Sequence, residues 1–99
     1  MFVIRDLMHC KPGKVRPMVQ KFQEMNKLTV AMGLGAMRVM TDIAAERYWT
    51  VVTEVEVDNL TTFDETSKKM MADPKFQEIM KDYHDLVQDG RREIYRLEK

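Results

Sequence analysis

The stretch Arg47–Val57, RYWTVVTEVEV, carries the clearest strand pattern in the chain. Successive side chains of a strand point to opposite faces. Trp49 therefore falls on the face of the valines at positions 51, 55 and 57, and Tyr48 falls on the face of Val52. This alternation predicts a strand with one face covered by helices, with Trp49 beneath them and Tyr48 on the opposite side.

The residues just before this strand predict its partner. GAMRVMTD, Gly35–Asp42, indicates a second strand, and the short IAAE segment keeps the two strands close in sequence. A connection of this length favours an antiparallel hairpin with a loop over a two-residue tight turn.

The first third of the chain predicts a strand followed by a helix. Phe2–His9 alternates and is rich in large apolar residues, and the KPGK of Lys11–Lys14 ends it. From Val15 the apolar residues recur at three-and-four spacing, which is typical of an amphipathic helix. Pro17 fits in the first turn of this helix, and Gly33 supplies its end.

The segment MADPKFQE, Met71–Glu78, predicts a boundary between two helices. Thr62 opens a capping-box pattern and is the predicted N-cap of the first helix, which ends near Ala72. Asp73 is the predicted N-cap of the second helix, and Pro74 its first residue.

The second of these helices is predicted to end at Gly90, and Arg91–Lys99 to form the last strand. Its apolar residues share one stripe, which we expect to be buried: Phe76, Ile79, Met80, Tyr83 and Val87.

These elements give the order β-α-β-β-α-β, the ferredoxin-like arrangement of the α+β class. Its four-stranded antiparallel sheet carries both helices on one face and leaves the other face bare. Residues 1–99 are expected to form a single domain, which is too short to cover that face itself. Pairing with a second copy as a homodimer would bury it.

Composition limits the classes of partner. Sixteen basic and sixteen acidic residues are interspersed along the chain, so no nucleic-acid-binding stripe is expected. The apolar runs are far shorter than the roughly 20 residues that span a bilayer, so no membrane partner is expected and a cytoplasmic location is the default. Cys10 is the single cysteine, which excludes an intramolecular disulfide, and we interpret it as a structural thiol.

Two histidines are the candidate bases. His84 follows Met80 by one turn of the predicted helix and could act as a proton shuttle. His9, at the end of the first strand, could orient a substrate oxygen. The alternatives are a partly exposed or helix-capping His84 and a solvated His9. No carboxylates cluster at ligand spacing beside either, so no metal site is predicted.

Four residues are the candidate walls of an apolar ligand pocket between the helices and the sheet. Phe22 lies on the first helix, Trp49 on the clearest strand, and Met80 and Tyr83 on the second helix. Such side chains line sites for flat apolar molecules and also fill hydrophobic cores. Both uses stay open from the sequence.

Three strand arginines, Arg5, Arg38 and Arg96, have two interpretations. They could bind a ligand carboxylate through the planar guanidinium, or they could pair with glutamates such as Glu54 on neighbouring strands.

The KPGK turn, the hairpin carrying Trp49 and the ADPKFQEIM segment resemble, at similar places, those of NIPSNAP-like proteins of the dimeric α/β barrel superfamily. The resemblance covers nearly the whole chain. It implies an assembly in which two sheets pack through their bare faces into a barrel, with the helices outside.

The same superfamily includes antibiotic-biosynthesis-type monooxygenases, which oxidise polycyclic aromatics without a metal or flavin, and haem-degrading monooxygenases. The haem degraders carry a tryptophan, an axial histidine and an asparagine. This chain has Met70 or Met71, Met80, and Arg5 or Asp6 at those three places. The resemblance therefore does not extend to a haem site, and no cofactor is expected.

Two functional hypotheses follow. The first is a small-molecule-binding homodimer that performs cofactor-independent oxygenation, or a related proton transfer, on an apolar or aromatic substrate, with His84 or His9 as base. The second is a dimer without catalysis that serves as a binding or scaffold module. They differ in whether a histidine faces an open pocket.

Overall fold

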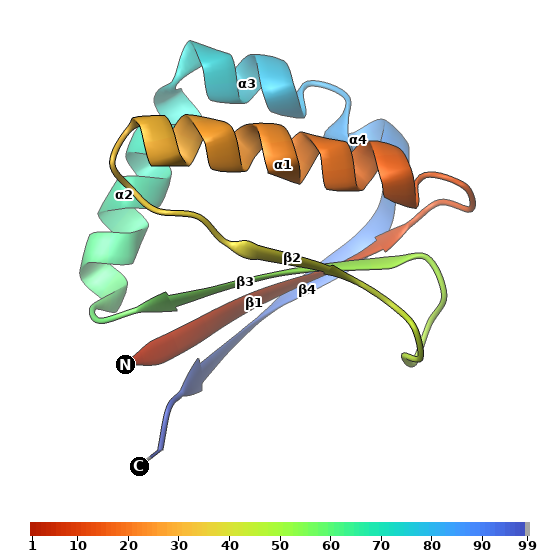
Figure 1. Cartoon of the computed structure of the whole chain (residues 1–99), viewed down its shortest axis with the longest axis horizontal. Helices are drawn as coiled ribbons and strands as arrows, with labels where there is room; N and C mark the ends of the chain where they lie inside the picture. Colours follow the sequence, from red (N-terminus) through yellow and green to blue (C-terminus); the bar gives the residue numbers. More distant parts are fainter. Residues whose placement is uncertain (99) are drawn as a thin grey trace.

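A computed structural model describes residues 1–98, and it forms one antiparallel sheet with helices on one side (Figure 1). The strands lie in the order β2-β3-β1-β4, and neighbouring strands are antiparallel. This confirms the predicted ferredoxin-like α+β fold. In chain order the elements are β1 (Phe2–Cys10), α1 (Val15–Ala31), β2 (Arg38–Thr41), β3 (Thr50–Val57), α2 (Leu60–Ala72), α3 (Pro74–Met80), α4 (Tyr83–Leu86) and β4 (Val87–Arg96).

The core lies between α1 and the two central strands. Met18, Phe22 and Met25 project from one face of α1 and pack with Met8 of β1 and Val51 of β3. None of these side chains is more than 6% exposed. The three-and-four spacing of the apolar residues in α1 produces this packing, since it places them on a single helix face.

The end of α1 confirms the prediction for Gly33. This glycine has φ +76°, a left-handed conformation that glycine adopts without steric cost. Its N–H donates to the Val30 carbonyl at 3.0 Å, and the Leu34 N–H donates to the Thr29 carbonyl at 2.8 Å. This paired arrangement is a Schellman motif, and it satisfies carbonyls that the helix end would otherwise leave free.

The boundary between α2 and α3 also lies where the sequence places it. Asp73 Oδ1 accepts hydrogen bonds from the N–H groups of Lys75 and Phe76, at 2.8 and 3.3 Å. The N-cap of α2, however, is Asn59 and not Thr62, because the Asn59 side chain accepts from the Thr62 N–H. The helix thus begins earlier than predicted.

The region after α3 differs more from the prediction. The helix stops at Met80, a separate turn forms α4, and β4 begins at Val87, before the predicted end of the helix at Gly90. Gly90 lies opposite Met8 in the ladder, where a Cβ atom would stand 2.8 Å from the Leu7 carbonyl oxygen. Close approach of two strands therefore explains this glycine. The end of the predicted last strand, Lys99, lies outside the described residues.

The hairpin differs as well. β2 spans only Arg38–Thr41, and β3 begins at Thr50. The predicted positions of Tyr48 and Trp49 on opposite strand faces are therefore wrong, because both residues belong to the loop 42–49. Trp49 has φ +61°, which is not a strand conformation, so the alternation of strand side chains begins only at Thr50. Its side chain is 45% exposed, and it does not lie beneath the helices.

The face of the sheet opposite the helices is open in the single chain (Figure 1). Cross-strand partners share a face, and Leu7 pairs with Val52, which pairs in turn with Met40. The strand arginines favour the pairing interpretation, since Arg5 and Arg38 both donate to the carboxylate of Glu54. Arg96 instead lies over the Phe2 ring, 5.7 Å from its centroid.

Candidate functional site

The loop 42–49 exposes more apolar surface than a solvated hairpin loop needs. Ile43 is 98% exposed and Tyr48 is 84% exposed, beside the partly covered Trp49. Figure 1 shows this loop extending beyond the end of the sheet, at the opposite end from the two termini. Exposed apolar side chains grouped in this way are typical of a surface that contacts a ligand or another molecule.

Hydrogen bonds hold the base of this loop. The Thr50 N–H donates to Asp42 Oδ1 at 2.8 Å, and the Thr50 hydroxyl donates to the Arg47 carbonyl at 2.8 Å. The Cys10 N–H donates to the Trp49 carbonyl, also at 2.8 Å. These bonds hold Trp49 in its left-handed conformation, which costs roughly 1–2 kcal/mol for a residue other than glycine.

A cavity of about 630 Å³ lies between this loop and the start of the β1–α1 connection. Its walls are formed by Ile43–Trp49 of the loop, with Cys10, Pro12 and Gln88 on the other side. The Cys10 side chain is only 2% exposed, and burial raises the pKa of its thiol, so it is protonated at neutral pH. This agrees with its interpretation as a structural thiol.

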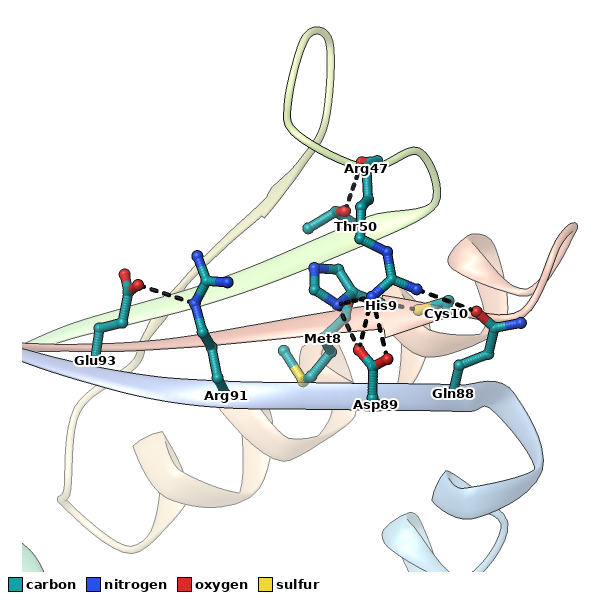
Figure 2. A network of polar contacts seen from close by, with 9 residues as sticks. All are labelled: Met8, His9, Cys10, Arg47, Thr50, Gln88, Asp89, Arg91 and Glu93. Carbon is teal, nitrogen blue, oxygen red and sulfur yellow. Dashed lines mark hydrogen bonds and ion pairs between the residues drawn. The ribbon is translucent and has the colours of Figure 1, made fainter.

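Arg47 connects the cavity to a polar cluster on the sheet. Figure 2 shows its guanidinium reaching back from the loop to His9 on β1 and Asp89 on β4. Nη1 donates to Asp89 Oδ1 and Oδ2, each at 3.1 Å, and Nη2 donates to Gln88 Oε1 at 3.4 Å. His9 Nδ1 lies 2.5 Å from Asp89 Oδ1 and 2.9 Å from Arg47 Nη1.

The electrostatics define the state of this cluster. The hydrogen bond from His9, followed by that from Arg47, holds the pKa of Asp89 below the usual range of an aspartate. The carboxylate is therefore ionised and acts as the acceptor, so Nδ1 of His9 is a donor. A neutral imidazole protonated at Nδ1 keeps a lone pair on Nε2, which can accept a proton or a hydrogen bond.

The cluster lies on the open face of the sheet. Met8 and Cys10 belong to the core beneath α1, so His9 between them points to the opposite face. Its side chain is only 11% exposed, which makes it the more enclosed of the two histidines. His9 is not one of the cavity walls. Arg47 is the residue that belongs both to the walls of the cavity and to the polar cluster with His9 and Asp89.

The second candidate base occupies a different environment. His84 is exposed on α4, where its ring makes an edge contact with Tyr83 at 5.3 Å between centroids. Within residues 1–98 no hydrogen bond joins His84 to His9, and the helix that was predicted to continue from Met80 to His84 is interrupted. The structure does not bring the two candidate bases together.

The predicted pocket walls are also separated. Phe22 is in the core, and Met80 and Tyr83 are partly buried against it, whereas Trp49 lines the cavity at the loop. Burial raises the pKa of Tyr83, and the negative charge of Asp6 adds to the effect. The centre of the helix-to-sheet interface is filled by side chains such as Met18 and Phe22. Whether any of the four contacts a ligand stays a prediction.

Sequence reasoning missed Arg47 and Asp89. Arg47 stood at the head of a predicted strand, and Asp89 stood within a predicted helix. Neither position gave a reason to place the two beside His9. The residues from Val87 to Arg96, VQDGRREIYR, show no apolar–polar alternation, so the sequence holds no clear signal that Asp89 lies in a strand.

A second, shallower cavity of about 270 Å³ lies between α1 and the α3–α4 region. Lys21, on its wall, donates to the Ile79 carbonyl at 2.8 Å and to Asp82 Oδ1. These contacts use two of the three donors of the ammonium group and connect α1 to the end of α3, so a structural role accounts for them.

Two structural features are absent from residues 1–98. No three His, Cys, Asp or Glu side chains within residues 1–98 are grouped so that they could hold a metal ion. In the same part of the chain, none of the helices combines the length and apolarity needed to cross a bilayer.

Comparisons with solved structures place the fold in a class. An uncharacterised NIPSNAP domain protein from Burkholderia xenovorans superimposes with a TM-score of 0.82 at 16% identity, over 99% of this chain and 95% of that chain. A NIPSNAP family protein from Agrobacterium tumefaciens also gives 0.82 at 16% identity, over 96% and 90% of the two chains. A protein described as an antibiotic biosynthesis monooxygenase gives 0.72 at 16% identity, over the whole of both chains.

The class is thus the ferredoxin-like α+β fold that these proteins share. Within it the structural likeness to NIPSNAP family proteins is greater than that to the monooxygenase, and the resemblance predicted from the sequence is confirmed at the level of fold. No protein-family model matches the chain. No curated protein matches it either.

Proposed function

We propose that the protein binds a small organic molecule in the cavity at the loop 42–49 and acts as a homodimer through the open face of its sheet. The carrying observation is the position of Arg47, which lines a cavity of about 630 Å³ and also contacts the His9–Asp89 pair. A cavity with apolar walls and a small number of placed polar groups is the usual form of a ligand site.

The homodimer is supported by the composition of the open face. Leu7, Val52 and Met40 form a continuous apolar band across three strands, and the charged residues beside it are already paired, as in the Arg5–Glu54–Arg38 cluster. A second copy of the same face would cover this band, and the charges nearest to it would stay paired within each copy. His9 and Asp89 would then lie at the edge of the covered region.

The chemistry of the proposal is proton abstraction by His9, which lies behind Arg47 and not on a cavity wall, so the bound molecule would have to extend past Arg47 to reach Nε2. The hydrogen bond to Asp89 orients the imidazole and stabilises the cation that forms when Nε2 accepts a proton. A substrate that forms a stabilised carbanion could then react with molecular oxygen without a protein cofactor. His9 fits this role better than His84, because His84 has no carboxylate partner within residues 1–98 and is exposed.

Native mass spectrometry of the purified protein tests the first part of the proposal. We expect a dimer, and a retained organic mass that is lost in a Trp49→Gly variant, because Trp49 is a wall of the cavity. Phe63→Ser changes an aromatic side chain on α2, away from both the cavity and the open face, and is the matched control. A bare monomer, or a mass retained equally by both variants, would contradict the proposal.

The alternative is a binding module without catalysis. The two versions differ in the effect of His9→Gln. If the protein is an enzyme, this variant still binds the retained molecule but no longer consumes oxygen or releases a product from it. If wild type and variant both bind without turnover, the binding module is the better description.

A further inference from the structure

We propose that the ligand of the loop cavity is a flat aromatic molecule with one carboxylate, which Arg47 binds while Trp49 contacts the ring. This inference rests on the proposed function, since it names the chemistry of the molecule that the cavity takes. Three observations support it: the donor capacity of Arg47, the aromatic walls, and the way the loop is held.

Arg47 has N–H donors that its contacts with the described residues do not use. A guanidinium carries five N–H groups in a planar fork that matches a carboxylate. Its contacts to Asp89 and Gln88 are long, between 3.1 and 3.4 Å, and its Nε donates to no group within residues 1–98. The side chain is 43% exposed and lines the cavity, so its remaining donors are accessible to a ligand.

Arg47 is also oriented before any ligand binds. Its carbonyl accepts the Thr50 hydroxyl, and its guanidinium is held beside His9 by its hydrogen bonds to Asp89 and Gln88 on β4 (Figure 2). An oriented donor loses little side-chain freedom on binding, which favours affinity.

Glu46 is the opposing charge, because it too lines the cavity. Its carboxylate is exposed and makes no ion pair or hydrogen bond with the described residues, so it is solvated and not oriented. Asp89 already pairs with Arg47, so a ligand carboxylate would bind the donors of the oriented guanidinium that Asp89 leaves free. A cationic ligand, bound through Glu46, is the outcome that a test has to separate from this one.

The ring site is formed by the end of the same loop. Trp49 and Tyr48 both line the cavity, and the strained φ of Trp49 is maintained by hydrogen bonds on either side of it. Strained backbone of this kind is concentrated at functional sites. An aromatic pair beside an arginine is suited to an aromatic acid, with the ring on the π faces and the carboxylate on the guanidinium.

Calorimetric titration with three naphthalene probes tests the inference: 2-naphthoate, the neutral 2-naphthamide and the cationic 2-naphthylmethylamine. We expect 2-naphthoate to bind at least about tenfold more tightly than 2-naphthamide, which is the usual effect of one ionic hydrogen bond. Arg47→Gln should remove this preference, and Arg47→Lys should reduce it because a lysine lacks the fork. Trp49 is the single tryptophan, so its fluorescence reports binding at the cavity directly.

Arg91→Gln is the matched control, since Arg91 lies on β4, two residues from Asp89, and does not line the cavity. It should keep the full preference for 2-naphthoate. Circular dichroism of each variant confirms that it is folded before the titrations are compared.

Four results would overturn the inference. Equal binding of acid and amide would leave the cavity as a site for neutral aromatics. A preference for the acid that survives in folded Arg47→Gln would assign the carboxylate to another residue. Tighter binding of the amine would assign the site to Glu46. If none of the probes binds and the fluorescence of Trp49 does not change, the proposed function fails together with the inference.

Discussion

His9 and Asp89 are joined by a contact of 2.5 Å between Nδ1 and Oδ1, although 80 positions separate them in the chain. The register of β1 and β4 places them directly opposite one another, next to the irregularity at His9 and Cys10. Strand pairing therefore brings His9 and Asp89 together as a dyad, and the loop 42–49 adds Arg47 to it from a third segment.

The dyad predicts how Asp89 titrates. Its pKa is lowered mainly by His9 and then by Arg47, so His9→Gln should raise the pKa of Asp89 more than Arg47→Gln does. Because the folded pKa lies below the unfolded value, this pairing stabilises the fold above the usual aspartate range, and the contribution is lost as the pH falls through the folded pKa. Carboxyl-carbon NMR titration of the three proteins is the measurement. An unchanged pKa in both variants would show that the contacts do not persist in solution.

The ion pairs of Glu54 predict a second contribution to folding stability that is lost in acid. The hydrogen bond from Arg5 is the largest cause of its lowered pKa, with Arg38 adding to it, and the carboxylate is only 10% exposed. Glu54→Gln should reduce stability at neutral pH by about 1 kcal/mol, since the arginines are partly exposed. This difference from wild type should shrink as the pH falls below the ordinary glutamate value of 4.5. Urea unfolding at neutral and acid pH measures it.

Glu56→Gln is the control for that comparison, because Glu56 lies on the same face of β3 and makes no ion pair within the described residues. If it loses stability to the same extent and with the same pH dependence, the effect is due to net charge and not to the Arg5–Glu54–Arg38 cluster.

Gly90→Ala should destabilise the fold by about 1–3 kcal/mol, because the added Cβ would stand 2.8 Å from the Leu7 carbonyl oxygen. The strands would have to separate locally to admit it. Arg91→Ala, at an exposed neighbouring position, should change stability by less than roughly 0.5 kcal/mol. Urea unfolding of both variants decides the matter, and a neutral Gly90→Ala would mean that β4 does not pack against β1 in this register.

The left-handed backbone at Trp49 predicts an unusual order of stability for two substitutions at this position. Trp49→Gly and Trp49→Ala both remove the ring, but glycine accepts φ +61° and alanine does not. The glycine variant should therefore be the more stable of the two by about 1 kcal/mol. At ordinary strand or helix positions the order is the reverse. Thermal unfolding of the pair is the check, and alanine being the better residue would show that Trp49 is not left-handed in solution.

The proposed homodimer predicts the effect of a charge in the apolar band. Leu7→Lys places a cation where Leu7 meets Val52 on the open face, so two copies would repel each other there and the dimer should dissociate. Lys27→Gln, on the exposed side of α1, should stay dimeric. Size-exclusion chromatography with light scattering compares them, and a dimeric Leu7→Lys would place the interface elsewhere.

Local signals were sufficient for most of the fold. Gly33 ends α1 with a left-handed residue, and Asp73 with Pro74 begins α3, because these residue types have strong conformational preferences of their own. Prediction failed where distant contacts decide the boundary. Gly90 resembles a helix end, but contact with Leu7 is what requires a glycine there.

The candidate site was predicted less well. His9 was identified as a possible base, but Trp49 was assigned to the face of a strand that begins only one residue later, at Thr50, and Arg47 and Asp89 were not identified. Alternation over RYWTVVTEVEV continues through position 49, and nothing in those letters shows that the backbone turns left-handed there. The Thr50 hydroxyl stabilises that turn from within the loop, whereas the hydrogen bond from the Cys10 N–H to the Trp49 carbonyl depends on β1 lying beside β3.

The sequence by itself determined the order of the strands and main helices, the buried face of α1, the end of α1 and the start of α3, because each depends on residues within a few positions of one another. Only the tertiary structure decided which polar groups meet, which brought His9, Arg47 and Asp89 together from three segments of the chain. Strand register and the path of a loop arise from contacts across the whole fold. The chemistry of the site can therefore be described only from the folded structure.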